Sequence, residues 1–178
     1  ALVLRPEYPE AYNNLGTVQK NIAEAIDYYR RALALRPDYA DANYNLGNVF
    51  RIQGKVQEAI ESYHCALKSK PDFVDAYHNL GNALVDQNRT QEALACYRRA
   101  MAIRPDNDKV HSAMLFGMSY ADVDPRTVEQ EYRKWDDLHA RPLAGDTRSY
   151  GNSRDADRRL RVGYMSGDFR EHPISYFV

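Results

Sequence analysis

A period of 34 residues is the feature that most restricts how this chain can fold. Residues 39–72 and residues 73–106 align position by position without a gap. Several independent positions matching in register indicate a structural repeat, in which each copy folds as one unit that stacks on the next. Both copies contain a Leu-Gly pair, an alanine, an aromatic residue, a second alanine and a closing proline, which in the earlier copy are Leu46-Gly47, Ala59, Tyr63, Ala66 and Pro71.

The spacing within a copy predicts a pair of antiparallel helices. Gly54 can take the left-handed conformation that a tight turn between them needs. Ala59, Tyr63 and Ala66 are separated by four and three residues, so they share one face of the second helix. The absence of a side chain at Gly47 lets the two helices approach closely. This pattern at this period is the signature of the tetratricopeptide repeat, and it predicts an all-α solenoid of helix hairpins.

The repeat pattern, in weaker form, divides the rest of the chain. Because residues 1–7 match only the tail of a repeat, we expect the natural protein to extend upstream. The expected units are the end of a preceding repeat at 1–7, a shortened repeat at 8–38, repeats at 39–72 and 73–106, a degenerate repeat with a capping helix at 107–140, a linker at 141–158, and the start of another domain at 159–178.

The repeat at 8–38 is shorter than those that follow it. Leu15-Gly16 precedes Leu46-Gly47 by 31 residues, whereas Ala25 precedes Ala59 by 34. Either the protein has lost almost one helical turn together with the turn glycine, or three residues are missing from the sequence. We favour missing residues, and an unbroken, well-ordered backbone through residues 20–22 would argue against that interpretation.

Residues 107–140 keep the repeat register while losing its consensus. Met114-Leu115 replaces the Leu-Gly pair. Asp124-Pro125 is typical of a helix N-cap followed by the first helical residue. A helix from Pro125 to about His139 is therefore expected to close the solenoid. Its predicted apolar face consists of Val128, Tyr132, Trp135 and Leu138.

From Arg159 onward the apolar residues follow a period of two. Leu160, Val162 and Tyr164 alternate with other residues and predict a strand, while Pro173 suits the first turn of a helix. A strand, a loop and a helix are the opening elements of an α/β domain whose binding loop follows the strand. The predicted fold class is therefore an all-α solenoid, then a short linker and the start of a truncated α/β domain.

Composition argues against several classes of partner. The 178 residues carry a formal net charge of −1, with 44% hydrophobic and 28% charged residues. This balance gives no bulk attraction to nucleic acid or to an anionic membrane. No apolar run approaches the roughly 20 residues of a membrane-spanning helix. Cys65 and Cys96 fit no metal motif and indicate a reducing compartment, so we expect a cytoplasmic protein.

An asparagine precedes the Leu-Gly position in each repeat. Asn14, Asn45 and Asn79 would form a column along the concave, first-helix side of stacked repeats. An amide can pair with a peptide backbone without reading its side chains, so the column is a candidate peptide-binding site. The alternative is that these amides cap or bridge neighbouring helices. The open ends of the array would also allow copies of the chain to form a homo-oligomer.

Three stretches in this order resemble a known family. The repeats are followed by VHSAMLFGMSY at 110–120, by a helix that carries Trp135, and by RLRVGYMSGDFREHPISYF at 159–177. The order resembles the bacterial O-GlcNAc transferase and SPINDLY-like protein O-glycosyltransferases over essentially the whole chain, and the last stretch is the specific part. The resemblance implies a repeat region that selects protein acceptors, joined to a two-lobed, GT-B-like transferase domain.

The resemblance also implies the chemistry of the parent protein. It would be an inverting, metal-independent enzyme that transfers GlcNAc from UDP-GlcNAc to Ser or Thr, or fucose from GDP-fucose in the SPINDLY branch. His172 matches the histidine near that family's active site, and Asn14, Asn45 and Asn79 match its peptide-backbone-binding residues. Most of the transferase domain is absent from this chain, so we expect the chain alone to bind no cofactor or metal and to be inactive.

The residues alone leave other interpretations open. Imidazole titrates near neutrality and can donate to a phosphate or accept a hydroxyl proton, but a His-Pro pair at a helix start is also a common cap. A non-enzymatic scaffold that binds partner proteins would need the repeats and not residues 159–178. Four further histidines have no partner at metal-ligand spacing and are expected at the surface or between helices: His64, His78, His111 and His139.

Overall fold

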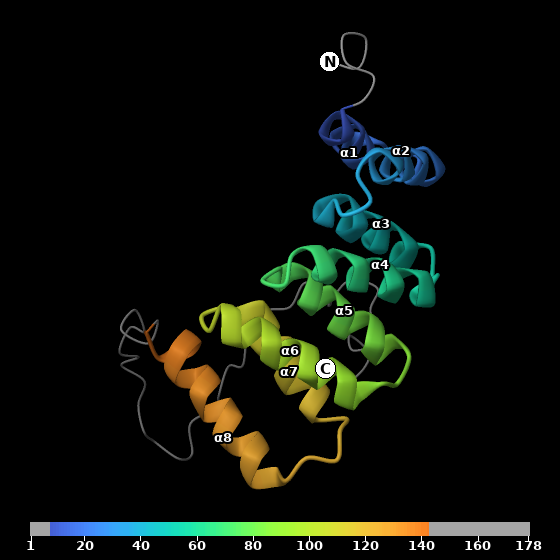
Figure 1. Ribbon diagram of the computed structural model, residues 1–178. Helices are drawn as coiled ribbons and strands as arrows, with labels where there is room; N and C mark the ends of the chain where they lie inside the picture. Colours follow the sequence, from blue (N-terminus) through green and yellow to red (C-terminus); the bar gives the residue numbers. More distant parts are fainter. Residues whose placement is uncertain (1–7, 143–178) are drawn as a thin grey trace, which may run out of the picture. The chain divides into compact units, whose positions relative to one another are not determined.

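Helix hairpins stacked in sequence order make up the part of the chain that the computed structural model describes, residues 8–142 (Figure 1). The helices in this range are α1 (Pro9–Val18), α2 (Ile22–Leu35), α3 (Ala40–Ile52), α4 (Val56–Ser69), α5 (Val74–Asp86), α6 (Thr90–Ile103), α7 (Asp108–Met118), α8 (Pro125–Trp135) and the π-helical turn η1 (Asp136–Ala140). Helices α1 and α2, α3 and α4, and α5 and α6 pair as hairpins, and each second helix packs on the next first helix.

The first helices of the hairpins also follow one another along the stack. Helix α1 contacts α3, α3 contacts α5, and α5 contacts α7. Equivalent positions on these helices therefore form rows on one surface, which we term the first-helix face. The predicted all-α solenoid is confirmed for residues 8–142. The expected repeat end at 1–7, nearly all of the expected linker and the expected strand, loop and helix at 159–178 lie outside the described residues.

The two helices of a hairpin interlock as the repeat pattern predicts. Ala59, Tyr63 and Ala66 are all fully buried. A Cβ atom on Gly47 would lie 2.6 Å from the Tyr63 ring, closer than real contacts allow. Glycine is therefore needed where the tyrosine ring crosses the first helix. Gly54 has a φ of +73° in the connecting turn, a conformation that glycine adopts without strain.

The shortened first hairpin closes by ending its first helix early. Helix α1 stops at Val18 after 10 residues, against 13 in α3. The side chain of Asn21 then caps α2 by accepting from two backbone N–H groups of the first turn. Tyr29 remains buried against Gly16, so the interlock is kept. The backbone continues through residues 20–22 into α2, and our interpretation that residues are missing there stays a prediction.

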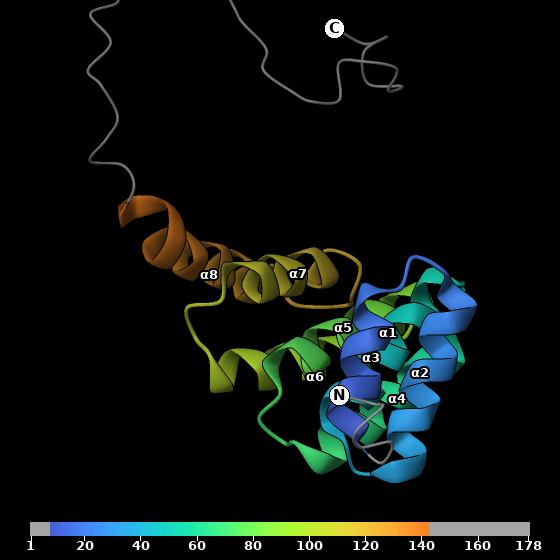
Figure 2. The same ribbon diagram turned by 90° about the horizontal axis from the view of Figure 1, so that it is seen from above.

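The fourth hairpin keeps the repeat register and loses the interlock. Met114 and Leu115 stand at the positions of Leu80 and Gly81, and both are 5% exposed. Because Leu115 fills the place of a glycine, a tyrosine ring could not cross α7 there, and the matching position in α8 is Glu131. Neither α8 nor η1 contains a buried residue. Figure 2 shows α8 beside α7, at the edge of the stack.

The predicted capping helix is confirmed in its extent, and its last turn is π-helical instead of α-helical. Asp124 caps α8 by accepting from a backbone N–H of the first turn at 3.1 Å. The α-helix stops at Trp135, and the π-helical turn continues to Ala140. Trp135 packs against the core, whereas Tyr132 and Leu138 are 48% and 52% exposed. The helix therefore covers the end of the array only in part.

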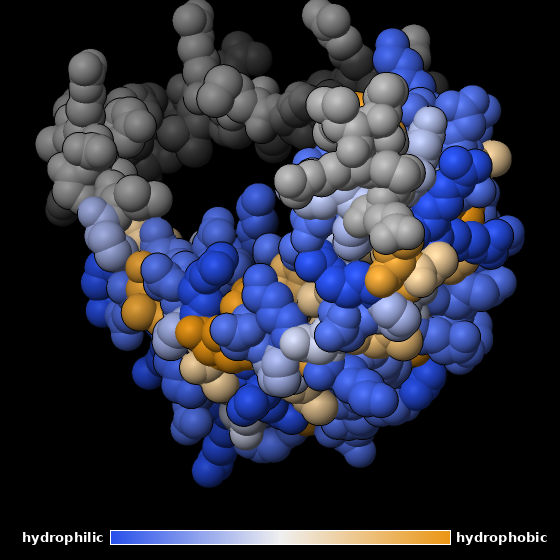
Figure 3. Space-filling model, turned by 45° about the horizontal axis from the view of Figure 1, so that its top comes forward, coloured by the Kyte–Doolittle hydropathy of each residue, from blue (hydrophilic) through white to orange (hydrophobic). Residues whose placement is uncertain are grey.

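The described surface is largely hydrophilic. Figure 3 shows one face on which hydrophobic residues form small, separate patches among hydrophilic ones. In residues 8–142 no helix has both the length and the apolar character to cross a membrane. Cys65 is exposed, Cys96 is half-buried, and both thiols are free, in line with the predicted surface and helix-contact roles.

Candidate functional site: the first-helix face

The predicted column of asparagines lies on the first-helix face. Asn45 belongs to α3 and Asn79 to α5, and both side chains are half-buried. Asn14 on α1 is exposed. Because these three helices contact one another in succession, the asparagines occupy equivalent places along one row.

Hydrogen bonds connect each repeat to the preceding one along this row. Asn45 Nδ2 donates to Asn13 Oδ1 over 3.0 Å. Asn79 Nδ2 donates to Tyr44 Oη over 3.1 Å and to Asn48 Oδ1 over 2.8 Å. Asn13 and Tyr44 occupy equivalent positions of the repeat, so both asparagines make the same kind of contact. The amides therefore bridge neighbouring helices, which was the alternative left open by the sequence.

Bridging uses only the donor half of these amides. An asparagine side chain has two donor hydrogens and one acceptor oxygen. Asn45 and Asn79 both donate, and within residues 8–142 no donor reaches either Oδ1 atom. The donated bonds fix the side chains in place, while the half-buried position leaves each oxygen accessible from the surface. Each oxygen can therefore accept from a backbone N–H of an extended chain.

Buried tyrosines donate hydrogen bonds to the asparagines that follow the Leu-Gly pairs. Tyr63 Oη donates to Asn48 Oδ1, and Tyr97 Oη donates to Asn82 Oδ1, each over 2.8 Å. Burial raises the pKa of both tyrosines to about 12, so the hydroxyls remain protonated donors at neutral pH. Asn48 accepts from Tyr63 and from Asn79, which joins the hairpin core to the row of amides.

The row of bridging amides ends at the third full repeat. The next asparagine position, in α7, is Ala113. Within the described residues His78 and Asn82 consequently receive no bond from a following repeat, and their Nε2 and Nδ2 atoms lie 3.4 Å apart. Burial lowers the pKa of His78, so its neutral imidazole can accept from the Asn82 amide.

Sequence reasoning found the donors of this network and missed the acceptors. Asn48 and Asn82 each follow the glycine of the Leu-Gly pair, so their 34-residue spacing was a usable signal. The acceptor position before the Asn-Leu-Gly triplet changes from Asn13 to Tyr44 to His78. No single residue type marks that position, and only the structure reveals that Asn13 and Tyr44 both accept there from the following repeat.

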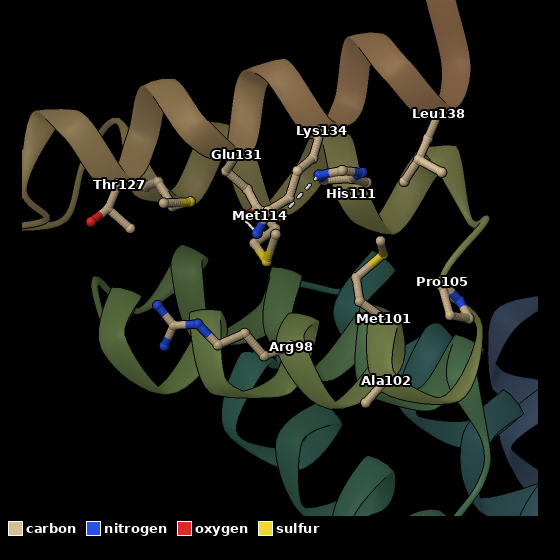
Figure 4. A pocket seen from close by; sticks show the side chains of 11 residues that line it. Arg98, Met101, Ala102, Pro105, His111, Met114, Thr127, Glu131, Lys134 and Leu138 are labelled. Carbon is tan, nitrogen blue, oxygen red and sulfur yellow. Dashed lines mark hydrogen bonds and ion pairs between the residues drawn. The ribbon is translucent and has the colours of Figure 1, made fainter. Parts of the chain in front are cut away.

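A groove between α6, α7 and α8 is the other concave feature of note (Figure 4). Its volume is about 460 Å³. The alanines at positions 93 and 100, which let α6 approach its partner, become Thr127 and Lys134 in α8. These larger side chains line the groove together with Arg98 and Glu131. Its apolar wall consists of Met101, Ala102, Pro105, Met114, Met118 and Leu138.

Two histidines meet beside this groove, a pairing that their separation of 28 residues did not reveal. His111 Nδ1 and His139 Nε2 lie 3.2 Å apart. His111 is 1% exposed, and its Nε2 lies 3.3 Å from Glu131 Oε1, within ion-pair distance but outside hydrogen-bond geometry. Burial lowers the pKa of His111, although the Glu131 carboxylate opposes that shift. No group of three or more metal-ligating side chains occurs among residues 8–142.

Profiles of one repeat family match the chain in three places. A profile described as a TPR repeat matches residues 47–88, and two described as a tetratricopeptide repeat match residues 18–64 and 74–107. Residues 18–107 are therefore tetratricopeptide repeats, as the period and the helix interlock predict. No curated protein sequence matches the chain.

Solved structures of repeat proteins are similar to this chain. MamA is 19% identical with a TM-score of 0.73, over 80% of this chain and 84% of MamA. YrrB, described as a TPR protein with an unusual peptide-binding site, is 19% identical with a TM-score of 0.70, over 78% of this chain and 72% of its own. At these identities the likeness shows the fold alone.

An O-GlcNAc transferase mutant from Thermobaculum terrenum is similar over more of the chain. It is 26% identical with a TM-score of 0.71, and the match covers 95% of this chain and 32% of the transferase. This chain therefore spans about a third of the length of that enzyme. The candidate catalytic residue His172 lies outside the described residues, so its role stays a prediction.

Proposed function

We propose that this chain is the acceptor-binding region of a protein O-glycosyltransferase and that its first-helix face holds an extended peptide. The observation that carries the proposal is the row of amides in which Asn45 and Asn79 donate to the preceding repeat, while neither Oδ1 atom receives a donor from residues 8–142. Asn14 continues the row on α1 with an exposed amide.

The geometry of the row suits recognition of a peptide backbone. Every residue of an acceptor except proline has a backbone N–H, so regularly spaced amide oxygens can hold many sequences. The amides are already ordered by their bonds within the protein, which reduces the side-chain entropy lost on binding. In this proposal the first-helix face binds acceptor peptides of many sequences, and other contacts select among these sequences.

The transferase part of the proposal draws support from two observations. The stretch 159–177 resembles the opening of the O-GlcNAc transferase catalytic domain. The match to the Thermobaculum terrenum enzyme covers 95% of this chain, which is more than the repeats alone span. In the parent enzyme a Ser or Thr hydroxyl would attack the sugar donor near His172, with inversion and without a metal. UDP-GlcNAc is the first choice of donor, and GDP-fucose is the alternative of a SPINDLY-type enzyme.

A non-enzymatic scaffold is the second candidate function. The likeness of this chain in fold to MamA and YrrB favours it, because tetratricopeptide repeats suffice to bind partner proteins. Both candidates use the first-helix face in the same way and would place the protein in the cytoplasm. Only the transferase needs residues 159–178 and donor chemistry.

Peptide binding tests the shared part of the proposal. We expect the double variant Asn45→Ala/Asn79→Ala to bind fluorescein-labelled Ser- and Thr-containing peptides more weakly in anisotropy titrations, with an unchanged far-UV circular dichroism spectrum. Gln57→Ala removes an exposed amide from α4 and should leave binding unaltered. Equal affinity of the double variant and the unchanged chain would remove the amide row from the argument.

Sugar transfer tests the enzymatic part. The natural polypeptide, purified from its source cell, is incubated with a Ser/Thr peptide and radiolabelled UDP-GlcNAc or GDP-fucose. We expect incorporation from one donor and its loss in His172→Ala. Incorporation from neither donor, with peptide binding intact, would leave the scaffold as the function.

A further inference from the structure

We propose that a pocket between α7 and α8 binds one aromatic or large aliphatic side chain of the peptide that the first-helix face holds. This inference rests on the proposed peptide-binding function and deepens it, because it assigns a preference for side chains to a face whose amides read only backbone. We term this site the aromatic pocket. It is lined by Ser112, Leu115, Phe116, Ser119, Tyr132 and Trp135.

The repeat register places the aromatic pocket in line with the amide row. Ser112 and Phe116 in α7 occupy the positions of Tyr44 and Asn48 in α3. Those two residues of α3 are the ones that accept the bonds donated by Asn79. An extended chain lying along the amides therefore reaches the aromatic pocket at the C-terminal end of the same face.

The surfaces that remain open in the pocket are mainly aromatic and aliphatic. The indole nitrogen of Trp135 donates to Ser112 Oγ over 3.1 Å, and Ser119 Oγ donates to the Leu115 carbonyl over 3.2 Å. Both serine oxygens thus already take part in hydrogen bonds within the protein. The side chains of Phe116 and Tyr132, which are 57% and 48% exposed, remain for a ligand together with the buried Leu115, and the phenol hydroxyl of Tyr132 is the polar group among them.

The size of the pocket fits one large side chain. Its volume is about 300 Å³, at the low end of the range for small-molecule sites. Aromatic pairs at such sites are stabilised by ring-edge contacts in addition to buried area. One apolar anchor beside a run of backbone contacts would also fix the register of the bound chain, which the repeated amides alone cannot do.

The test compares two labelled peptides that differ at one position. Both consist of Ser, Thr, Gly and Ala residues and carry fluorescein; one has a single Phe towards one end, and the other has Ala there. In anisotropy titrations the full chain should bind the Phe peptide at least about tenfold more tightly than the Ala peptide. This difference is expected from the burial of one aromatic side chain. The double variant Phe116→Ala/Tyr132→Ala should lose this preference and bind both peptides as the unchanged chain binds the Ala peptide.

Controls separate the failure of this inference from the failure of the proposed function. Ile52→Ala truncates an exposed apolar residue of α3, 71% exposed, and should keep the preference for Phe. Both substituted side chains of the pocket variant are exposed, and its undiminished affinity for the Ala peptide would report an intact face.

Four results would overturn the aromatic pocket. Equal binding of both peptides to the unchanged chain would do so while the proposed function survives, and so would a Phe preference that persists in the pocket variant. Sedimentation that shows a dimer dissociated by the pocket substitutions would assign the pocket to a second copy of the chain. Binding of neither peptide would overturn the pocket and the amide face together.

Discussion

The second and third full repeats differ from the fourth at a few positions that share one register. In the regular repeats a glycine of the first helix faces a buried tyrosine of the second, at Gly47 with Tyr63 and at Gly81 with Tyr97. In the fourth these positions are Leu115 and Glu131. In the fourth repeat the large apolar side chain at this contact belongs to the first helix instead of the second. The two helices still pair, but no tyrosine ring packs against a glycine. The open groove and the exposed aromatic residues of the fourth repeat are the consequence.

The largest effect should come from truncating the interlocking tyrosine. Tyr97→Ala removes a ring that is 1% exposed, together with its bond to Asn82, and should lower the free energy of unfolding by about 3–5 kcal/mol. Glu131→Ala at the matching position in α8 should lower it by less, about 1 kcal/mol, because Glu131 is half-buried in a groove wall and its partner Lys134 is 64% exposed. Urea denaturation followed by circular dichroism measures both.

Equal losses in these two variants would contradict the comparison. They would mean that α8 is held to α7 as firmly as α6 is held to α5. Tyr97→Phe is the matched control for the hydroxyl, since it keeps the ring against Gly81 and removes only the bond to Asn82. We expect it to lower the free energy of unfolding by about 0.5–1.5 kcal/mol.

A smaller effect is expected from filling the glycine position. Gly47→Ala places a methyl group 2.6 Å from the Tyr63 ring. Overpacking of this kind lowers stability by about 1–3 kcal/mol, offset in part by the better helix propensity of alanine, about 1 kcal/mol. At Gly117 in α7 a Cβ would meet the flexible end of Leu94 at 3.2 Å, so Gly117→Ala should be neutral or stabilising. Thermal melts measure the stability of both variants. Destabilisation by Gly117→Ala alone would contradict the prediction.

The sequence predicted the features that depend on contacts within one repeat. The interlock of Ala59, Tyr63 and Ala66, the turn at Gly54 and the N-cap at Asp124 all follow from local spacing, and all are confirmed. These contacts recur at fixed offsets along one chain segment, so periodicity alone reveals them.

Contacts between repeats and at the end of the array were harder to predict. The bond from Asn79 to Tyr44 joins residues 35 apart through an acceptor whose type varies between repeats. His111 and His139 meet only because α8 folds back on α7. The exposure of Tyr132 could not be predicted either, since an apolar stripe indicates which residues share a face and not whether another element covers it.

Acid should loosen the fourth repeat before the regular ones. His111 is enclosed by Glu131, His139 and Lys134, and burial lowers its pKa from the usual 6.5 while α8 is docked. Undocking returns the pKa to its usual value, so the undocked state binds a proton more readily. Docking of α8 is therefore complete above pH 6.5 and weakens as the pH falls through the lowered pKa.

Trp135 gives this acid effect a direct signal. It is the only tryptophan in the chain, and its ring lies 5.7 Å from that of His139. We expect its fluorescence to change below pH 6.5 while the far-UV circular dichroism of the regular repeats stays constant. His111→Gln should abolish the change. Persistence of the change in that variant would show that protonation of His111 does not loosen α8.

The smallest effect should come from extending the amide row into the fourth repeat. Ala113→Asn places an amide where Asn79 stands in the preceding repeat, within reach of His78 and Asn82 if the repeat geometry holds. One added hydrogen bond contributes about 0.5–1.5 kcal/mol, and asparagine in a helix is about 0.7 kcal/mol less favourable than alanine, so stability should change little.

Donation to the neutral imidazole disfavours its protonated form, so the pKa of His78, already lowered by burial, should fall further. Proton NMR titration of the His78 ring measures this, and Ala113→Leu supplies bulk without a donor. If the pKa of His78 were the same with and without the new amide, the amide would not reach the imidazole. Helix α7 would then depart from the repeat geometry on the first-helix face as well as at its contact with α8.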